Sequence, residues 1–253
     1  MCRRLGGGME ISMNEVIRQL FERKSVRAFT EQEISGEDRQ LILEAAAMAP
    51  TAGNQQLYTI LDITDAALKE KLAESCDHQP FIAKGKMVLI FCADCRKWYE
   101  AFQAAGCKPR LPGAGDLMLA VSDAMIAAQN AVTAAWSLGI GSCYIGDIME
   151  NVEIHRDILT LPSYVFPVGM LVFGYPTQQQ MERVKPERVA LKHLVHENGY
   201  RQMAEEDYRE MFAIKTGNQS YEAWMEAFCK RKYNSDFSRE MTRSVAVYLE
   251  DFQ

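Results

Sequence analysis

The sequence predicts an α/β or α+β fold built around one central sheet. Four segments have the apolar or alternating pattern of strands, and they lie among seven or eight segments with helical spacing. No internal repeat interrupts this pattern. The chain of 253 residues is 48% hydrophobic and 25% charged, which is ordinary for a folded domain and excludes collagen-like, mucin-like and mostly disordered chains.

The four expected strands differ in pattern. Leu57–Thr64 alternates between apolar and polar residues, whereas Lys86–Ala93 and Phe166–Tyr175 are apolar runs of the length expected for buried strands. Ser142–Ile145 is a shorter candidate that follows a long helix.

Capping residues mark where the helices begin. The expected helices are Asn14 to about Arg23, Ser35 to Ala49, Asp65 to Ser75, Asp116 to about Leu138, and Asn151 to a point before Pro162. Gly139 suits the C-terminal cap of the long helix. Residues 176–200 are expected to be irregular, and 201–253 helical with breaks near Gly217-Asn218 and Ser235. We expect a flexible lead at 1–12 and a single domain over 13–253, of which about 201–253 is a helical C-terminal excursion.

Charge and cysteine content limit the kinds of partner and compartment. The net charge of −6 argues against nucleic acid as a partner, because phosphate binding needs a basic face. Seven cysteines and no apolar signal region near the N-terminus predict free thiols in a reducing cytoplasm. The most apolar window, 117–138, contains Asp123 and Gln129, so we expect a buried core helix and no membrane partner.

The first candidate binding motif is Arg23-Lys24-Ser25-Val26-Arg27, at the end of the first helix. Cations at both ends and a hydroxyl between them could hold an anion. The alternative is a solvated helix end, which cations favour for dipole reasons alone.

A second candidate is the loop Pro50-Thr51-Ala52-Gly53-Asn54-Gln55-Gln56, whose amides could pair with the edge of a heterocycle. It could equally be a polar turn after a helix. The third is Gly139 to Gly146, which is not a Rossmann loop because a helix precedes it and a strand follows. Its glycines would still let a planar group approach the backbone.

Other motifs carry less weight. Cys92 and Cys95 form a lone C-x-x-C at a strand end, which is either a redox pair or two incidental thiols. Tyr200 stands where a zincin would have its second histidine after His196-Glu197, so we expect no metal site. Lys185-Pro186-Glu187-Arg188 adds two cations late in the chain.

Taken in order, these pieces resemble the FMN-dependent nitroreductase superfamily. The ordered set is R-K-S-x-R, A-P-T-A-x-N-x-Q, a long helix leading into G-x-G-x-x-Y-I-G, and a strand ending in F-G-Y-P. The later K-P-E-R, H-E-N-x-Y and helical C-terminus are similar to the NfsA/Frp-type NAD(P)H-dependent branch. The resemblance covers Asn14 to the end, and it implies an α+β fold with a mainly antiparallel sheet in an interlocked homodimer.

The resemblance also implies residue roles at an FMN site between subunits. Arg23, Lys24 and Ser25 would contact the phosphate and ribityl chain, with Lys185 and Arg188 as a second phosphate contact. Arg27 would lie at the pyrimidine edge, Gln79 would reach the ring, and Tyr144, Ile145 and Gly146 would lie near N5. Pro50, Thr51, Ala52 and Asn54 would come from the partner subunit. The branch has shorter spacing in its K-P-R element, so Arg183 competes with Arg188 for this role. Asp147 stands where the branch usually has glycine, and its carboxylate either deters anionic substrates or points away.

The implied activity is NAD(P)H oxidation by a ping-pong mechanism, with hydride passing through flavin N5 to a nitroaromatic, quinone or flavin acceptor. No side chain need act as a nucleophile or a general acid–base, and Arg27 would give electrostatic support to the reduced flavin. The loop that grips the 2′-phosphate in the branch has only Lys215 as a cation here, so either NADPH or NADH could serve. Two alternatives remain open: a flavin carrier or sensor without efficient turnover, and a redox switch at Cys92 and Cys95.

Overall fold

The computed structural model describes residues 3–4, 10–11 and 13–253. The predicted lead at 1–12 therefore lies mostly outside the described residues, apart from the short antiparallel pair β1 (Arg3–Arg4) and β2 (Glu10–Ile11). The chain divides into two compact units, one formed by 1–183 with 241–253 and the other by 184–240. One domain over 13–253 stays a prediction.

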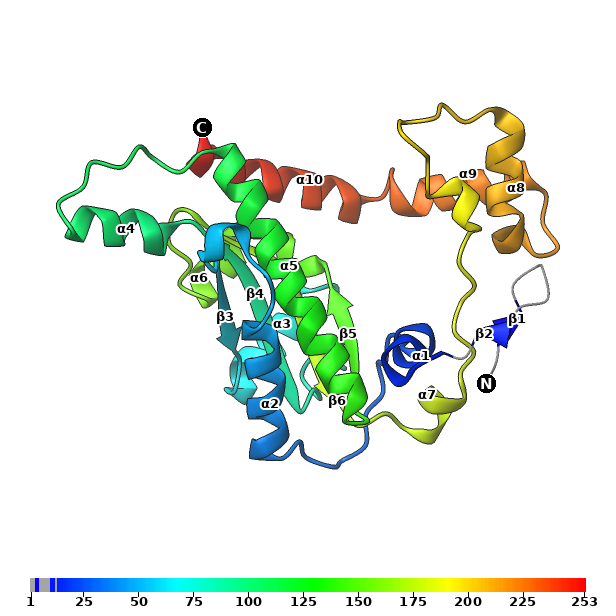
Figure 1. Ribbon diagram of the computed structural model, residues 1–253, viewed down its shortest axis with the longest axis horizontal. Coiled ribbons are helices and arrows are strands. Elements are labelled where there is room, and N and C mark those ends of the chain that lie inside the picture. The colour runs from blue at the N-terminus through cyan, green and yellow to red at the C-terminus, as the bar shows by residue number, and fades with distance from the viewer. Residues whose placement is uncertain (1–2, 5–9, 12) are drawn as a thin grey trace. The chain divides into compact units, whose positions relative to one another are not determined.

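The first unit contains a four-stranded antiparallel sheet (Figure 1). Its strands, in spatial order, are β3 (Tyr58–Asp62), β4 (Met87–Asp94), β6 (Val165–Gly174) and β5 (Gly141–Ile145). Every neighbouring pair is antiparallel. All four predicted strands are confirmed within one or two residues at most ends, and the α+β class with an antiparallel sheet is confirmed as well.

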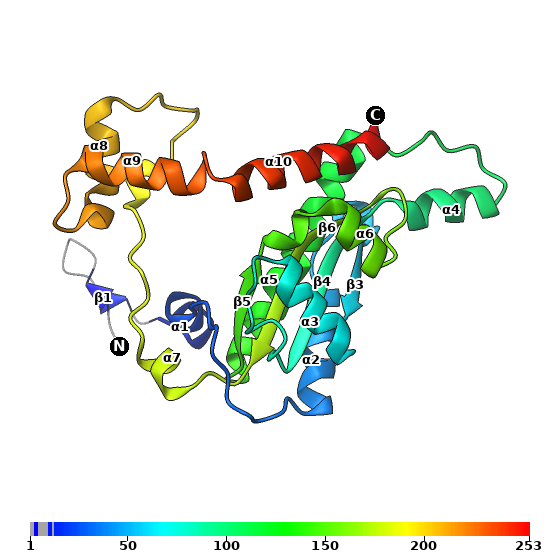
Figure 2. The same ribbon diagram turned by 180° about the vertical axis from the view of Figure 1, so that it is seen from behind.

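Both faces of the sheet are covered, as the alternation along β4 shows. Met87, Leu89 and Phe91 belong to one apolar cluster and Val88 and Ile90 to the other, and all five are fully buried. Helices α5 (Ala114–Ser137) and α2 (Gly36–Ala47) cover the first face, while α3 (Ala66–Ser75) and α6 (Val152–Ile158) lie on the other side (Figure 2).

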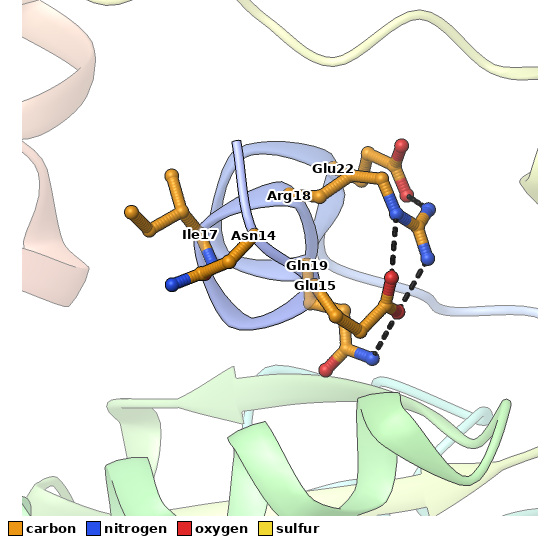
Figure 3. A network of polar contacts seen from close by, with 6 residues as sticks. All are labelled: Asn14, Glu15, Ile17, Arg18, Gln19 and Glu22. Atoms are coloured by element: carbon orange, nitrogen blue, oxygen red, sulfur yellow. Dashed lines mark hydrogen bonds and ion pairs between the residues drawn. The ribbon is translucent and has the colours of Figure 1, made fainter. Parts of the chain in front are cut away.

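Three of the predicted caps are present. Asn14 Oδ1 accepts from the Ile17 amide at 3.0 Å and begins α1 (Glu15–Glu22), on which Arg18 pairs with Glu15 and Glu22 (Figure 3). Ser35 and Asp65 cap α2 and α3 in the same way. Asn151 is the residue at which α6 begins, as predicted, but its side chain does not cap the helix. Its backbone is left-handed (φ 48°), and its side chain donates to the Ser75 carbonyl instead.

Four helical segments differ from the prediction. Helix α5 begins at Ala114 rather than Asp116, whose carboxylate accepts from the Gly113 amide in the first turn. Helix α2 ends at Ala47 rather than Ala49, because Pro50 disfavours helical backbone at the residue before it and Met48 already leaves the helix. Helix α4 (Arg96–Ala104) and helix α7 (Gln178–Glu182) were not expected, and α7 lies inside the stretch predicted to be irregular. The remaining short turns are 3₁₀ segments: η1 (Ala52–Asn54), η2 (Asp147–Met149), η3 (Leu191–His193) and η4 (Glu250–Phe252).

The second unit is helical, as expected. Helix α8 (Glu205–Thr216) ends at Gly217, whose positive φ of 56° stops the helix, and Ser220 caps α9 (Tyr221–Lys232). Helix α10 (Asp236–Leu249) begins in this unit, and its part from Met241 onward belongs to the first unit. There Tyr248 is fully buried with its ring 5.0 Å from that of Phe166.

Among the described residues, α5 is the one helix long and apolar enough to cross a membrane. Its buried side chains belong to the cluster that packs against the sheet, and Asp123 lies among them. We therefore assign α5 as the core helix of the first unit.

Candidate functional site

The cationic segment Arg23–Arg27 runs beside the edge strand β5 instead of continuing α1. The Val26 amide donates to the Ser142 carbonyl at 2.9 Å, and Ser25 forms a parallel bridge with Ser142. Val26 is fully buried, whereas Arg27 is exposed and Arg23 and Ser25 are half-buried. Because side chains alternate along extended chain, the two arginines and Ser25 share the side opposite Val26.

The glycines around β5 have different roles. A Cβ on Gly141 would lie 2.6 Å from a Val26 methyl group, so this glycine allows the cationic segment to pack against the strand. Gly139 has a positive φ of 77° and ends α5. Gly146 is exposed, and a Cβ there would meet only the end of Met149 at 3.8 Å. Gly139 and Gly146 are both open around the backbone, and of the two Gly146 directly follows β5.

The two arginines dominate the electrostatics at this edge. The Arg23 guanidinium lies 5.7 Å from the centre of the Tyr144 ring. Burial raises the pKa of the Cys143 thiol, and the charges of Arg27 and Arg23 oppose that shift. Burial likewise raises the pKa of Tyr144 to about 12, again opposed by Arg23. The site therefore carries fixed positive charge beside neutral Cys143 and Tyr144 side chains.

Helix α7 holds the cationic segment in place. Lys24 Nζ donates to the carbonyl of Met181 at 2.6 Å and to that of Arg183, while Arg183 Nη2 donates back to the Ser25 carbonyl. The Arg27 amide donates to Gln180 Oε1 at 3.3 Å. These reciprocal bonds place the Arg183 guanidinium beside Ser25 and direct the Lys24 ammonium to the end of α7.

The loop from Pro50 to Asn54 is organised by a carboxylate on α5. Asp123 is 3% exposed, and its two oxygens accept from the amides of Ala52 at 3.0 Å and Leu57 at 3.2 Å. Within the loop, Thr51 Oγ1 accepts from the Gln56 amide, and Asn54 Oδ1 accepts from Gln56 Nε2. The loop is therefore a fixed structure with polar groups at its surface.

The Gln79 side chain is hydrogen-bonded to Asp147, just after the end of β5. Its Nε2 donates both to the Asp147 carboxylate and to the Cys76 carbonyl, the latter at 2.9 Å. The structure thus brings Gln79 together with the strand end that carries Tyr144, Ile145 and Gly146.

Three other predicted residues, Lys185, Arg188 and Lys215, belong to the second unit. Arg188 donates to the Pro186 carbonyl at 3.4 Å, and the Lys215 ammonium lies 5.6 Å from the Phe212 ring. Their roles toward a ligand stay predictions.

The cysteine pair shows no sign of a redox site. Cys92 and Cys95 are 0% and 5% exposed, and burial raises the pKa of each thiol to about 12. Such thiols carry almost no thiolate at neutral pH, which is the reactive form. In the described part of the chain, no group of three or more His, Cys, Asp or Glu side chains could hold a metal ion.

Comparison with known proteins identifies the family of this chain. Residues 20–175 match the model of the nitroreductase family. The chain is 30% identical over 240 residues to an FMN reductase [NAD(P)H] of Bacillus subtilis, covering 94% of this chain and 92% of that protein. The chain belongs to the nitroreductase family. The predicted resemblance is therefore confirmed, including its NfsA/Frp-type branch.

Two further matches extend the family assignment along the chain. An oxygen-insensitive NADPH nitroreductase of Salmonella typhimurium is 32% identical over 219 residues, covering 84% of this chain and 88% of that protein. The solved structure of NfrA2 from B. megaterium is 27% identical with a TM-score of 0.79, covering 92% of this chain and 98% of that one. The nitroreductase fold is therefore shared across both units and not only across the sheet.

Sequence reasoning missed the role of Asp123 in shaping the site, and it left Arg183 and Asp147 undecided. Asp123 was noted only as a polar residue in an apolar helix, although a carboxylate at a helix position surrounded by alanines indicates a buried hydrogen-bonding role. The contact of Arg183 with Ser25 had no local signal, because 158 residues separate them. Asp147 was recognised as a departure from the family, and the structure shows that its carboxylate contacts Gln79.

Proposed function

We propose that this chain is an FMN-dependent NAD(P)H oxidoreductase that works by a ping-pong mechanism on nitroaromatic, quinone or free flavin acceptors. Two of its relatives are named as an FMN reductase [NAD(P)H] and an NADPH nitroreductase, which supports this activity class. Bound FMN would supply the hydride chemistry, accepting electrons from NAD(P)H and passing them to the acceptor. The observation that carries the proposal is the row Arg23, Ser25 and Arg27 along β5, next to the open backbone of Gly146.

The chemistry of this row fits a phosphorylated flavin. Two guanidiniums and a hydroxyl on one side of an extended segment match an anion with several acceptor oxygens. Gly146 has no side chain and no close neighbour, so a flat ring could lie against its amide. Arg27 would stabilise the negative charge that a reduced flavin ring acquires.

The remaining predicted contacts are assigned in the same way. Lys24 and Arg183 would hold the phosphate-binding segment, with Arg183 also near enough to Ser25 to contact the phosphate. Tyr144 and Ile145 would line the ring, and Pro50, Thr51, Ala52 and Asn54 would approach it from the partner subunit. Lys185 and Arg188 would supply the second phosphate contact, and Lys215 the contact with the nicotinamide cofactor.

We further propose that the protein is a homodimer. Val16 and Ile17 on α1 are 59% and 40% exposed, and Met118 on α5 is 64% exposed. Figure 3 shows Ile17 on the side of α1 opposite the Arg18 ion pairs. An apolar helix face beside a charged one is typical of a subunit interface.

The absorption spectrum of the purified protein, before and after anaerobic NADPH or NADH, tests the proposal. We expect oxidised-flavin bands that bleach with at least one of the two reductants. Bands that neither reductant bleaches would identify a flavin carrier or sensor. A colourless protein that takes up no added FMN would exclude the flavoenzyme.

Single substitutions separate the competing phosphate contacts. Removing a charge-assisted hydrogen bond costs about 1.5–3 kcal/mol, or roughly 10- to 150-fold in FMN affinity. If only one of Arg183 and Arg188 contacts the phosphate, its alanine variant should have an FMN dissociation constant roughly 10- to 150-fold higher than the other alanine variant. Arg27→Ala should leave FMN bound but slow its reduction. An Arg27→Ala protein with normal turnover would remove this residue from the mechanism.

A further inference from the structure

Gln79 is the one predicted flavin contact whose amide orientation the structure determines by chemistry alone. Its two hydrogen-bond partners are the Cys76 carbonyl, at 2.9 Å, and the Asp147 carboxylate. A carbonyl oxygen and an ionised carboxylate can only accept hydrogen bonds. The end of the side chain that faces both must therefore be the NH₂ group, although oxygen and nitrogen of an amide are usually hard to tell apart.

The carbonyl end of the same amide is left for a ligand. Gln79 Oε1 accepts no hydrogen bond from any residue within the described part of the chain. The side chain is half-buried, and Oε1 is not among the buried polar atoms that lack a partner, so solvent reaches this oxygen. Gln79 consequently presents an acceptor, and both of its donor hydrogens face Asp147 and Cys76.

The backbone around Gln79 is fixed as well. Asp77 and His78 have left-handed backbone, with φ of 60° and 49°. They turn the chain so that the backbone N–H of Gln79 donates to the Ala73 carbonyl at 2.8 Å. Two consecutive non-glycine residues in this region are uncommon and persist only where the surroundings determine them. The end of α3 is also tied to α6, since Asn151 Nδ2 donates to the Ser75 carbonyl at 2.9 Å.

Asp147 is close enough to act on this turn as a charge. Burial, and after it the Asp147 carboxylate, raise the pKa of the Cys76 thiol to about 12. Asp147 begins the 3₁₀ turn η2, immediately after the open backbone of Gly146. The residue that departs from the family pattern therefore lies between the predicted ring contact at β5 and the predicted ring contact at Gln79.

We propose that Asp147 is a positioning residue that orients the Gln79 amide so that its carbonyl oxygen, and not its NH₂ group, faces the bound flavin. This inference rests on the proposed FMN site. The oxidised isoalloxazine ring has a single N–H, at N3, and otherwise offers acceptors. A Gln79 side chain locked in this orientation pairs with that N–H and selects for it. Asp147 thus acts on flavin recognition through Gln79 and does not contact the electron acceptor itself.

A double-mutant cycle on FMN affinity tests the coupling. The variants are Asp147→Ala, Gln79→Met and the double variant, with FMN dissociation constants measured by flavin fluorescence quenching on protein stripped of cofactor. We expect Asp147→Ala to weaken FMN binding about fivefold in the wild-type background and less than twofold beside Gln79→Met. Equal weakening in both backgrounds would overturn the inference, as would no weakening in either. Asp157→Ala, at an exposed position on α6, is the control.

A second measurement asks which group Gln79 contacts. N3-methyl-FMN lacks the ring N–H, so wild type should bind FMN about tenfold more tightly than this analogue. That ratio should fall toward one in Gln79→Met and become smaller in Asp147→Ala. A ratio that neither substitution changes would overturn the inference, because a purely structural role for Asp147 would weaken both flavins alike.

Two controls keep the result interpretable. Asp147→Asn preserves the shape of the side chain while making its orientation toward Gln79 ambiguous, so it should reproduce part of the loss if Asp147→Ala fails to fold. Wild-type protein that binds no FMN at all would refute the proposed cofactor. Wild-type protein that binds FMN without coupling between the two positions would refute this inference alone.

Discussion

At the scale of single residues, Asp123 holds a loop of the proposed site in place, although it lies in an apolar helix. One carboxylate accepts from both the Ala52 and Leu57 amides, and it is nearly inaccessible to solvent. Its negative charge also adds to burial in raising the pKa of Tyr58. The helix therefore positions the loop at Pro50–Asn54 through a single side chain.

We predict that Asp123→Ala destabilises the protein by about 2–4 kcal/mol, because two backbone donors lose their acceptor. For a unit of this size the melting temperature should fall by about 5–15 °C. Asp123→Asn should cost roughly half as much, since one amide oxygen can still accept from one donor. Urea unfolding measures both. Ser122→Ala, on the exposed side of the same helix turn, is the control, and a similar loss there would contradict the role of Asp123.

Cysteine reactivity should follow burial. Cys107 and Cys229 are exposed, whereas Cys76, Cys92, Cys95 and Cys143 are buried. Burial raises the pKa of the Cys92 and Cys95 thiols to about 12, so neither should react quickly with an aromatic disulfide reagent at about pH 8. We expect a variant with Cys2, Cys107 and Cys229 changed to Ser to show no fast thiol in the folded state. Fast labelling of that variant would restore the redox-switch hypothesis.

Residue types in the sequence predicted the chemistry of the site, but not its geometry. The spacing of Arg23, Ser25 and Arg27 predicted an anion-binding segment without knowledge of the fold. Their alignment along β5 depends on Val26 packing against Gly141, a contact between residues more than a hundred positions apart. Local sequence patterns do not predict contacts between residues so far apart in the chain.

At the scale of elements, the strands were predictable and the short helices were not. Apolar runs of strand length identified β4 and β6, because a strand buried on both faces has no other pattern. Helix α7 spans only Gln178–Glu182 and has no buried residue, so neither periodicity nor composition separates it from a loop. Its C-terminal end is bonded to the distant cationic segment, since Lys24 donates to the Met181 carbonyl and Arg183 donates to the Ser25 carbonyl.

Helices α3 and α6 are joined by a histidine whose titration should affect stability. His155 is fully buried, and its Nε2 lies 2.8 Å from Ser75 Oγ. Burial lowers the pKa of His155 below its ordinary value of 6.5. As the pH falls, His155 in the unfolded chain therefore becomes protonated at a higher pH than His155 in the folded protein. The resulting stability is fully present above pH 6.5 and is lost as the pH falls below it, through the folded pKa.

We predict that the melting temperature of wild type falls more steeply between about pH 7.5 and about pH 5 than that of His155→Gln. Glutamine can still bond to Ser75 but does not titrate. Calorimetry across this range measures both curves. His78→Gln, which replaces an exposed histidine, is the control for the substitution itself. Parallel curves for wild type and His155→Gln would show that this histidine does not contribute.

At the scale of the whole molecule, the proposed homodimer would complete the proposed flavin site. The cationic row on β5 and the loop held by Asp123 lie on different elements, and the family resemblance places that loop on the flavin of the other subunit. If so, the exposed apolar residues of α1 and α5 matter for cofactor binding as well as for assembly. The exposure of Val16 and Ile17 on α1 in a single chain could not be predicted from the sequence.

We therefore predict that Val16→Glu weakens both association and FMN binding. A buried, unpaired carboxylate in an interface costs several kcal/mol, enough to raise a dimer dissociation constant by roughly a hundredfold or more. Sedimentation velocity should show wild type at about twice 28.7 kDa and the variant mainly as monomer at micromolar concentration. Glu22→Gln, on the charged side of the same helix, should remain dimeric. A monomeric variant that keeps wild-type FMN affinity would show that one subunit forms the flavin site alone, and the loop at Pro50–Asn54 would then need another role.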